Sequence, residues 1–142
     1  MKSLSPNKLA SASGGGAAQA EVSGTTVSIA DAASADLTIT NTGKAGQLLS
    51  IETDAAAWVT VYASQATRTA DASRTETTDP TAGSGVLAEV ITTGAQTVLL
   101  TPGATYFNAE STPIGNLYLK VVNKSGASAA ITATLSVVPV QV

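Results

Sequence analysis

Hydrophobic and polar residues alternate along most of the chain beyond residue 24. In Leu37-Thr-Ile39 and Val59-Thr-Val61, for example, every second residue is apolar. Successive side chains of a strand point to opposite faces, so this period of two predicts half-buried β-strands. Comparable runs rich in Val, Ile, Leu and Thr lie at 27–29, 37–40, 49–51, 58–62, 86–91, 98–100, 117–122 and 131–137, which predicts about eight short strands. The Ala-rich stretch 30–36 is expected to form one helical turn at most.

Turn-forming residues separate these runs. They include Asn41-Thr-Gly43, Thr93-Gly94, Pro102-Gly103 and the segment 123–126. Glycine adopts positive φ without strain and proline presets φ, so such pairs favour tight connections, and Pro102-Gly103 fits the centre of a type II turn. Short strands joined by turns predict an all-β fold, an antiparallel β-sandwich of the Ig-like or jelly-roll kind.

The first 23 residues have a different composition. They are rich in Ser, Ala and Gly, with three consecutive glycines at 14–16. Such a segment buries little surface, so we expect a flexible N-terminal arm at 1–23 and a sandwich domain at 24–142. The tripeptide 18–20 is similar to a signal-peptide cleavage site, but the apolar stretch that a secretory signal requires is missing.

Charged residues are scarce, at 12% of the chain, about half of the usual share of roughly 25%. A surface of Thr, Ser, Ala and Asn suits a protein that is packed in an assembly, although a low-charge extracellular domain has the same composition. The net charge is −3, and the few Lys and Arg residues are too scattered to neutralise phosphates, so no nucleic-acid partner is expected. No apolar run is long enough to predict a membrane span.

The residues that most enzymes use are missing. The chain has no histidine and no cysteine, which excludes a Ser-His-Asp triad and thiolate chemistry. Asp31 and Asp36 are too far apart in sequence for a calcium loop, so we expect no metal. No glycine-rich phosphate loop opens a helix, and no cofactor is expected. We therefore predict a protein that is not an enzyme.

One segment concentrates charge. Residues 64–85 link two predicted strands and contain Arg68, Asp71, Arg74 and Asp79, and a second long connection spans 103–115. Long loops in compact domains are usually functional. The arginines could pair with carboxylates of a neighbouring subunit, or they could form an internal network with Asp71, Asp79 or Glu89 that fixes the loop. The sequence leaves both interpretations open.

Two aromatic residues, Trp58 and Tyr62, share one face of a predicted strand. They are expected to anchor the core or the sheet packing, and the alternative is a platform that stacks on a sugar. The stretch from Leu100 to Tyr106 resembles the tyrosine corner of fibronectin type III domains, in which the tyrosine hydroxyl bonds to the backbone. Its role would be structural.

A longer series of residues is similar to a known family. It consists of Trp58-x-x-x-Tyr62, Arg68-x-Ala70-Asp71-x-x-Arg74, Asp79-Pro80, Gly83-x-Gly85-Val86, Glu89-Val90, Phe107-Asn108-x-Glu110 and Val121-x-Asn123. The series resembles small β-sandwich virion proteins of tailed bacteriophages, particularly cyanophages. The resemblance implies a structural role on the particle and brings no catalytic residues.

Together these observations predict a bacteriophage virion protein, with a capsid decoration (cement) protein as the first hypothesis. The expected partners are the major capsid protein or other virion subunits, and the expected state is a homo-oligomer, preferably a trimer. Trp58, Tyr62, Phe107 and the charged residues of 64–85 are the interface candidates. The alternatives are a tail or neck component and a carbohydrate-binding adhesin module.

Overall fold

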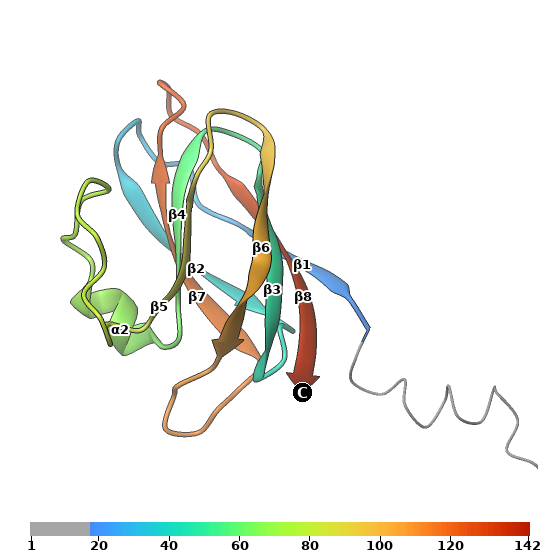
Figure 1. The fold of residues 1–142 in the computed structure, drawn as a ribbon. Helices are drawn as coiled ribbons and strands as arrows, with labels where there is room; N and C mark the ends of the chain where they lie inside the picture. The colour runs from blue at the N-terminus through green and yellow to red at the C-terminus, as the bar shows by residue number, and fades with distance from the viewer. Residues whose placement is uncertain (1–17) are drawn as a thin grey trace, which may run out of the picture.

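The computed structural model describes residues 18–142 and contains two antiparallel sheets packed face to face (Figure 1). One four-stranded sheet has the order β1 (Ala20–Thr25), β8 (Thr132–Gln141), β3 (Ala45–Thr53), β6 (Gln96–Phe107). The other has the order β2 (Ser34–Thr40), β7 (Asn116–Asn123), β4 (Ala57–Tyr62), β5 (Val86–Ile91). The predicted all-β sandwich is confirmed.

The strand pairing is nested. β1 pairs with β8, β2 with β7, β3 with β6 and β4 with β5. This is the pairing of a long hairpin that has rolled up into two sheets, the jelly-roll arrangement. The strand order therefore selects the jelly roll from the two sandwich types that the sequence left open.

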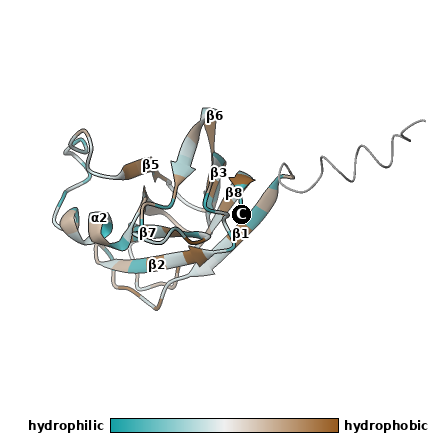
Figure 2. Ribbon diagram, turned by 90° about the horizontal axis from the view of Figure 1, so that it is seen from below, coloured by the Kyte–Doolittle hydropathy of each residue, from teal (hydrophilic) through white to brown (hydrophobic). Residues whose placement is uncertain are grey.

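The core lies between the sheets and follows the alternation seen in the sequence. On β8, Ala133, Leu135 and Val137 are fully buried, whereas the neighbouring Thr132 and Thr134 are partly exposed. Each buried Leu, Ile or Val contributes roughly 1.5–3 kcal/mol relative to an exposed one. The largest aliphatic core residues are Ile39, Leu48, Ile51, Leu117, Leu119, Ile131 and Leu135. Figure 2 shows the alternation of hydrophobic and hydrophilic positions along the strands.

The N-terminal part differs from the prediction in two places. β1 begins at Ala20, so the last residues of the predicted arm 1–23 belong to the sandwich, where their backbone pairs with β8. The rest of the predicted arm, residues 1–17, lies outside the described part of the chain. Residues 27–29, predicted as a strand, contribute only an isolated bridge from Ile29.

The stretch 30–36, for which the sequence allows one helical turn at most, contains no helix. Ala32 has φ 65°, a left-handed conformation that a right-handed helix does not contain, and Ser34 already belongs to β2. The alanines therefore form a tight turn between the first bridge and β2. The alanine-rich composition would allow a helical turn, but the chain turns at Ala32 and pairs as a strand from Ser34.

Strand β6 is longer than predicted because it continues through Pro102-Gly103, where the sequence predicted a turn. The Thr101–Pro102 peptide bond is cis and Gly103 has φ 108°. The pairing of β6 with β3 shifts register at this point and continues beyond it. Tyr106 is fully buried, and its hydroxyl donates a hydrogen bond to the carbonyl of Thr42 in the β2–β3 connection. The tyrosine thus bonds to the backbone, as expected, and it joins the two sheets.

No helix in the part of the chain that the structure describes is long and apolar enough to cross a membrane.

Candidate functional site: the loop that covers one sheet

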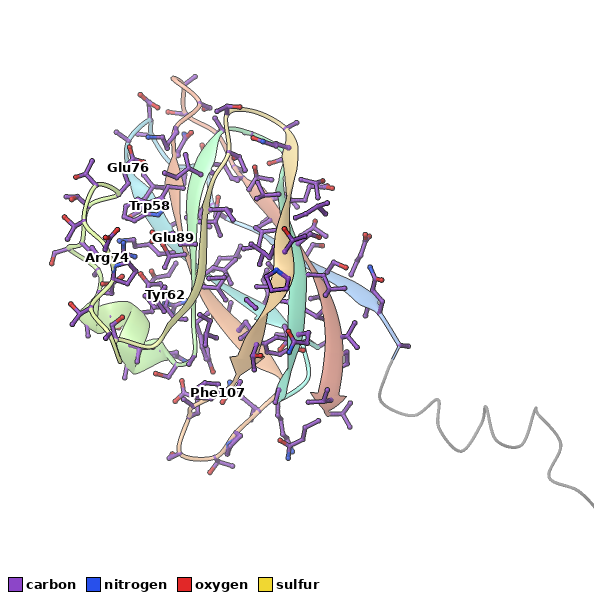
Figure 3. All side chains as sticks on the ribbon, viewed as in Figure 1. Trp58, Tyr62, Arg74, Glu76, Glu89 and Phe107 are labelled. Atoms are coloured by element: carbon purple, nitrogen blue, oxygen red, sulfur yellow. The ribbon has the colours of Figure 1, made fainter. Side chains whose placement is uncertain are left out.

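Residues 64–85 connect β4 to β5 and fold back over the outer face of the second sheet (Figures 1 and 3). We call this segment the covering loop. Because of it, all six residues of β4 are buried, including those that point away from the core. Tyr118 and Lys120 of β7 are buried beside them. The outer face of this sheet therefore has a small second core, made of aromatic and charged side chains.

A short helix starts the covering loop. Helix α2 (Gln65–Ala70) begins at a capping box: the Ser64 hydroxyl accepts a bond from the Thr67 N–H at 3.1 Å, and the Thr67 hydroxyl accepts one from the Ser64 N–H at 3.2 Å. At the other end of the loop, Gly85 has φ +84°, and a Cβ there would lie 2.4 Å from Thr67. The sequence did not predict this helix because six residues are too few for a 3.6 period to be seen.

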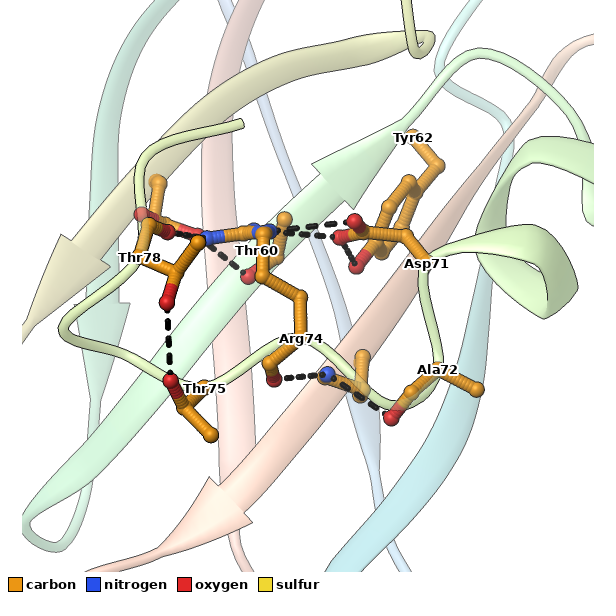
Figure 4. A network of polar contacts seen from close by, with 9 residues as sticks. Thr60, Tyr62, Asp71, Ala72, Arg74, Thr75 and Thr78 are labelled. Atoms are coloured by element: carbon orange, nitrogen blue, oxygen red, sulfur yellow. Dashed lines mark hydrogen bonds and ion pairs between the residues drawn. The ribbon is translucent and has the colours of Figure 1, made fainter. Parts of the chain in front are cut away.

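Arg74 organises the covering loop (Figure 4). Its Nε lies 2.9 Å and 3.0 Å from the two carboxylate oxygens of Asp71, and its Nη2 donates to Glu89 on β5. Its Nη1 donates to the Thr78 carbonyl at 2.9 Å. One guanidinium thus ties three parts of the chain together, and its side chain is only 7% exposed.

The two carboxylates that bind Arg74 are themselves held by β4. The Tyr62 hydroxyl donates to Asp71 at 2.6 Å, and the Thr60 hydroxyl donates to Glu89 at 2.9 Å. Hydrogen bonds to charged groups are stronger than neutral ones, and a network with every member satisfied is rigid. The loop is therefore fixed to the strand below it through alternate residues of that strand.

Trp58 lies under two cations. The Arg74 guanidinium is 5.3 Å from its ring centroid and the Lys120 ammonium is 4.7 Å away, so both make cation–π contacts. The tryptophan is 5% exposed and Tyr62 is fully buried. Both rings anchor the covering loop to the outer side of the sheet. The sequence instead predicts them in the core or between the sheets.

Arg68 has a different role from Arg74. Its Nη1 donates to the carbonyls of Leu37 and Leu119 at 3.2 Å and 3.4 Å, which fastens α2 to β2 and β7. Its Nε lies 3.4 Å from the Asp36 carboxylate, and its guanidinium is 5.6 Å from the Tyr118 ring. The carboxylate partner is thus Asp36, which the sequence analysis did not consider because nothing local links residues so far apart.

These contacts change the acid–base behaviour of the buried groups. Burial, together with the hydrogen bond to Asp71, raises the pKa of Tyr62 well above its usual value. The hydrogen bond to Glu89 raises the pKa of Arg74 above its already high usual value. Burial lowers the pKa of Lys120, whose ammonium reaches only the carbonyls of Ala72 and Arg74, at 3.3 Å and 3.4 Å. The ion pairs and hydrogen bonds of the cluster thus hold its charges in fixed places.

A cleft of about 490 Å³ opens between the covering loop and the turns at 31–34 and 122–124. Trp58 and Lys120 line its wall, and a salt bridge of 2.7 Å joins Lys124 to Glu76 at its edge. Among residues 18–142, no three His, Cys, Asp or Glu side chains are placed to hold a metal ion.

The structure brings five of the candidate residues together and places Asp79 and Phe107 elsewhere (Figure 3). Trp58, Tyr62, Asp71 and Arg74 meet in one network, with Arg68 beside it on α2. Asp79 is exposed near the end of the covering loop. Phe107 is 49% exposed at the end of β6, next to the segment 80–87 and away from the arginines.

Comparison of the chain with protein-family models, with curated proteins and with solved structures yields no match.

Proposed function

We propose that this chain is a non-enzymatic structural protein of a bacteriophage virion, and specifically a capsid decoration protein that binds the major capsid protein. A tail or neck component is the second location considered. The proposal joins the sequence resemblance to three features of the fold: its topology, the composition of one sheet face and the position of the aromatic rings.

The topology supports this proposal by analogy. Jelly rolls recur in viral capsid proteins and in lectins. A fold does not determine a function, so the choice between these two classes depends on the surfaces.

The uncovered sheet face carries the proposal. Cross-strand partners share a face of a sheet, and on the outer side of the first sheet seven of the ten residues in three neighbouring rows are Ser or Thr. We call this surface the hydroxyl face. It contains Ser23, Thr25, Ser50, Thr97, Thr132, Thr134 and Ser136, with Glu21, Glu52 and Leu99 as the other members of these rows. Hydroxyl groups cost less to bury than charged groups when they find hydrogen-bond partners, so this face can be covered by another protein more easily than a charged one.

The aromatic rings favour assembly over glycan binding. A platform that stacks on a sugar needs an open ring face, but Trp58 is 5% exposed and two cations lie over it. Tyr62 is fully buried under Asp71. Both rings serve to hold the covering loop.

In this proposal the sandwich is a rigid body that docks by its hydroxyl face. Copies contact one another laterally as a homo-oligomer, with a trimer preferred. Residues 1–17 extend the attachment to the capsid or to a sister subunit, which adds avidity without enlarging the body.

Co-sedimentation with expanded capsids tests the proposal. Thr134→Arg places a charge in the middle of the hydroxyl face and is expected to lower capsid occupancy at least tenfold, in line with the roughly 2 kcal/mol of a strong interface residue. Thr77→Arg, on the exposed side of the covering loop, is the matched control and should bind as the unchanged protein does. Equal occupancy for both variants would exclude the hydroxyl face as the docking surface.

Deletion of residues 2–17, which leaves β1 from Ala20 intact, is the companion experiment. Reduced occupancy is expected if the N-terminal segment adds attachment. Unchanged occupancy would remove the role given to this segment and leave the docking of the body intact. Failure of the full chain to sediment with capsids would contradict the decoration role as a whole.

A further inference from the structure

A second surface lies at the junction of the covering loop and β6, away from the Arg74 network. A groove of about 400 Å³ is lined there by Phe107 and by residues 80–87, which include Pro80, Val86 and Leu87. We call it the Phe107 groove. Half-exposed aromatic rings beside apolar walls mark contact surfaces, because such groups are otherwise withdrawn from water.

Two carboxylates lie close in sequence to residues that line this groove. Asp79 precedes Pro80, and Glu110 follows Phe107 by three residues. In the described part of the chain, neither carboxylate forms a salt bridge with Lys or Arg, whereas Asp36, Asp71, Glu76 and Glu89 all do. Glu110 accepts only the Gln65 N–H, at 2.8 Å. The groove thus combines apolar lining residues with two carboxylates that lie close to them in the chain.

The groove also adjoins an open strand edge. β5 ends its sheet and pairs only with β4. An extended peptide can add to such an edge through main-chain hydrogen bonds, with its side chains supplying specificity. The occupant that fits is an extended segment with an apolar side chain next to basic ones.

The chain itself contains such a segment. Of its seven basic residues, Lys2 and Lys8 lie in 1–17 and five lie in 18–142, while all ten acidic residues lie in 18–142. The body thus has a formal charge of −5 and the segment one of +2. Leu4 and Leu9 stand close to the two lysines. Apolar and charged groups of the segment match those of the groove.

We propose that residues 1–17 of one copy bind the Phe107 groove of a second copy, with a leucine against Phe107 and lysines at Asp79 and Glu110. β1, where the segment joins the body, and β6 form opposite edges of one sheet. Donor and acceptor are therefore on opposite sides of the molecule, which produces a head-to-tail contact that closes into a ring when the rotation allows. Fully extended, the segment reaches up to about 55 Å, enough to pass between neighbours.

This inference rests on the proposed assembly role, because it names the partner and the surface through which copies associate. The inference about self-association can be wrong while the decoration role is right. Self-association of the purified chain tests the groove, whereas co-sedimentation with capsids tests the decoration role.

Complementation between two full-length variants is the test. Phe107→Ser keeps the segment and disables the groove. Leu4→Ser combined with Leu9→Ser keeps the groove and disables the segment. Light scattering coupled to size exclusion measures the mass of each variant alone and of the two mixed. Val27→Ser is the matched control, because Val27 is a hydrophobic residue that is 74% exposed and lies outside both the groove and the hydroxyl face.

Each disabled variant is expected to self-associate at least tenfold more weakly than the unchanged chain, the usual effect of losing one apolar anchor. The mixture should recover a complex of one copy of each, because the intact segment of one meets the intact groove of the other. Val27→Ser should associate as the unchanged chain does. Wild-type association in Phe107→Ser, no complex in the mixture, or a chain that is monomeric at every concentration would each overturn the inference. Monomers that still bind capsids would overturn it while leaving the decoration role in place.

Discussion

Arg74→Met would test whether the Arg74 network holds the covering loop. The substitution keeps most of the volume of the side chain but leaves Asp71 and Glu89 without their cation. The two carboxylates are 11% and 24% exposed, so neither can be fully hydrated in place. Breaking a buried ion pair from one side costs roughly 3–5 kcal/mol. Each carboxylate keeps one hydroxyl donor, from Tyr62 or Thr60, so we expect the low end, about 3 kcal/mol.

The measurement uses the single tryptophan of the chain. Trp58 lies 5.3 Å from the Arg74 guanidinium, so acrylamide quenching of its fluorescence reports opening of the covering loop. Urea unfolding followed by circular dichroism reports the free energy of the whole domain. The expected result is stronger quenching together with a free energy of unfolding lower by about 3 kcal/mol.

Two further variants make the reasoning refutable. Lys124→Met breaks the partly exposed pair with Glu76 and should cost less than about 1 kcal/mol. Adding Asp71→Asn and Glu89→Gln to Arg74→Met removes the unpaired charges and should restore part of the loss. The account is wrong if Arg74→Met and Lys124→Met are equally mild, or if neutralising the carboxylates makes the Arg74 variant less stable.

Three further outcomes follow from the contacts. The raised pKa of Tyr62 means that the folded state holds the hydroxyl proton more tightly than the unfolded state, so the free energy of unfolding should fall by about 1.4 kcal/mol per pH unit above pH 10. Tyr62→Phe should show a shallower fall in urea titrations at these pH values. An identical slope in the two proteins would contradict the raised pKa. Gly46→Ala would bring a Cβ to 2.3 Å from the Val138 carbonyl and should prevent folding or cost more than about 3 kcal/mol by calorimetry, whereas Gly94→Ala, with open space around it, should change stability by less than about 1 kcal/mol. Asn123→Ala removes side-chain bonds to the Ile29 and Ala127 carbonyls and should lower the free energy of unfolding by about 2–3 kcal/mol; a neutral effect in denaturant titration would show that water replaces them.

The fold could be predicted from the sequence because the alternation of apolar residues is local and strong. Strands such as 58–62 and 86–91 were predicted within one residue of their observed ends. The jelly-roll order could not be derived, because strand pairing is decided by contacts between residues far apart in the chain. The turn predicted at Pro102-Gly103 is wrong because the strand continues through these residues, opposite a register shift of the partner strand β3 between Leu48 and Ser50. That shift also depends on residues far apart in the chain.

The candidate site was foreseen in part. The internal pairing of Arg74 with Asp71 and Glu89 was one of two alternatives, and the structure contains those contacts. The pairing of Arg68 with Asp36 was not foreseen, because it depends on how β2 is placed beside α2. The outward position of Trp58 and Tyr62 was missed as well. Large aromatic residues on a strand usually indicate a core, and only the path of the covering loop shows that they form a second one.

The covering loop leaves the molecule with one covered and one open sheet. The middle of one sheet, at β4 and β7, is already occupied by the chain's own residues 64–85, so a second layer of molecules finds no comparable free sheet there. The opposite sheet has no such lid among the described residues. A particle that binds these molecules through the open sheet would gain a coat one molecule thick, with the covering loop as its outermost layer. Growth would stop after that monolayer because the bound molecule no longer offers the surface by which it attached.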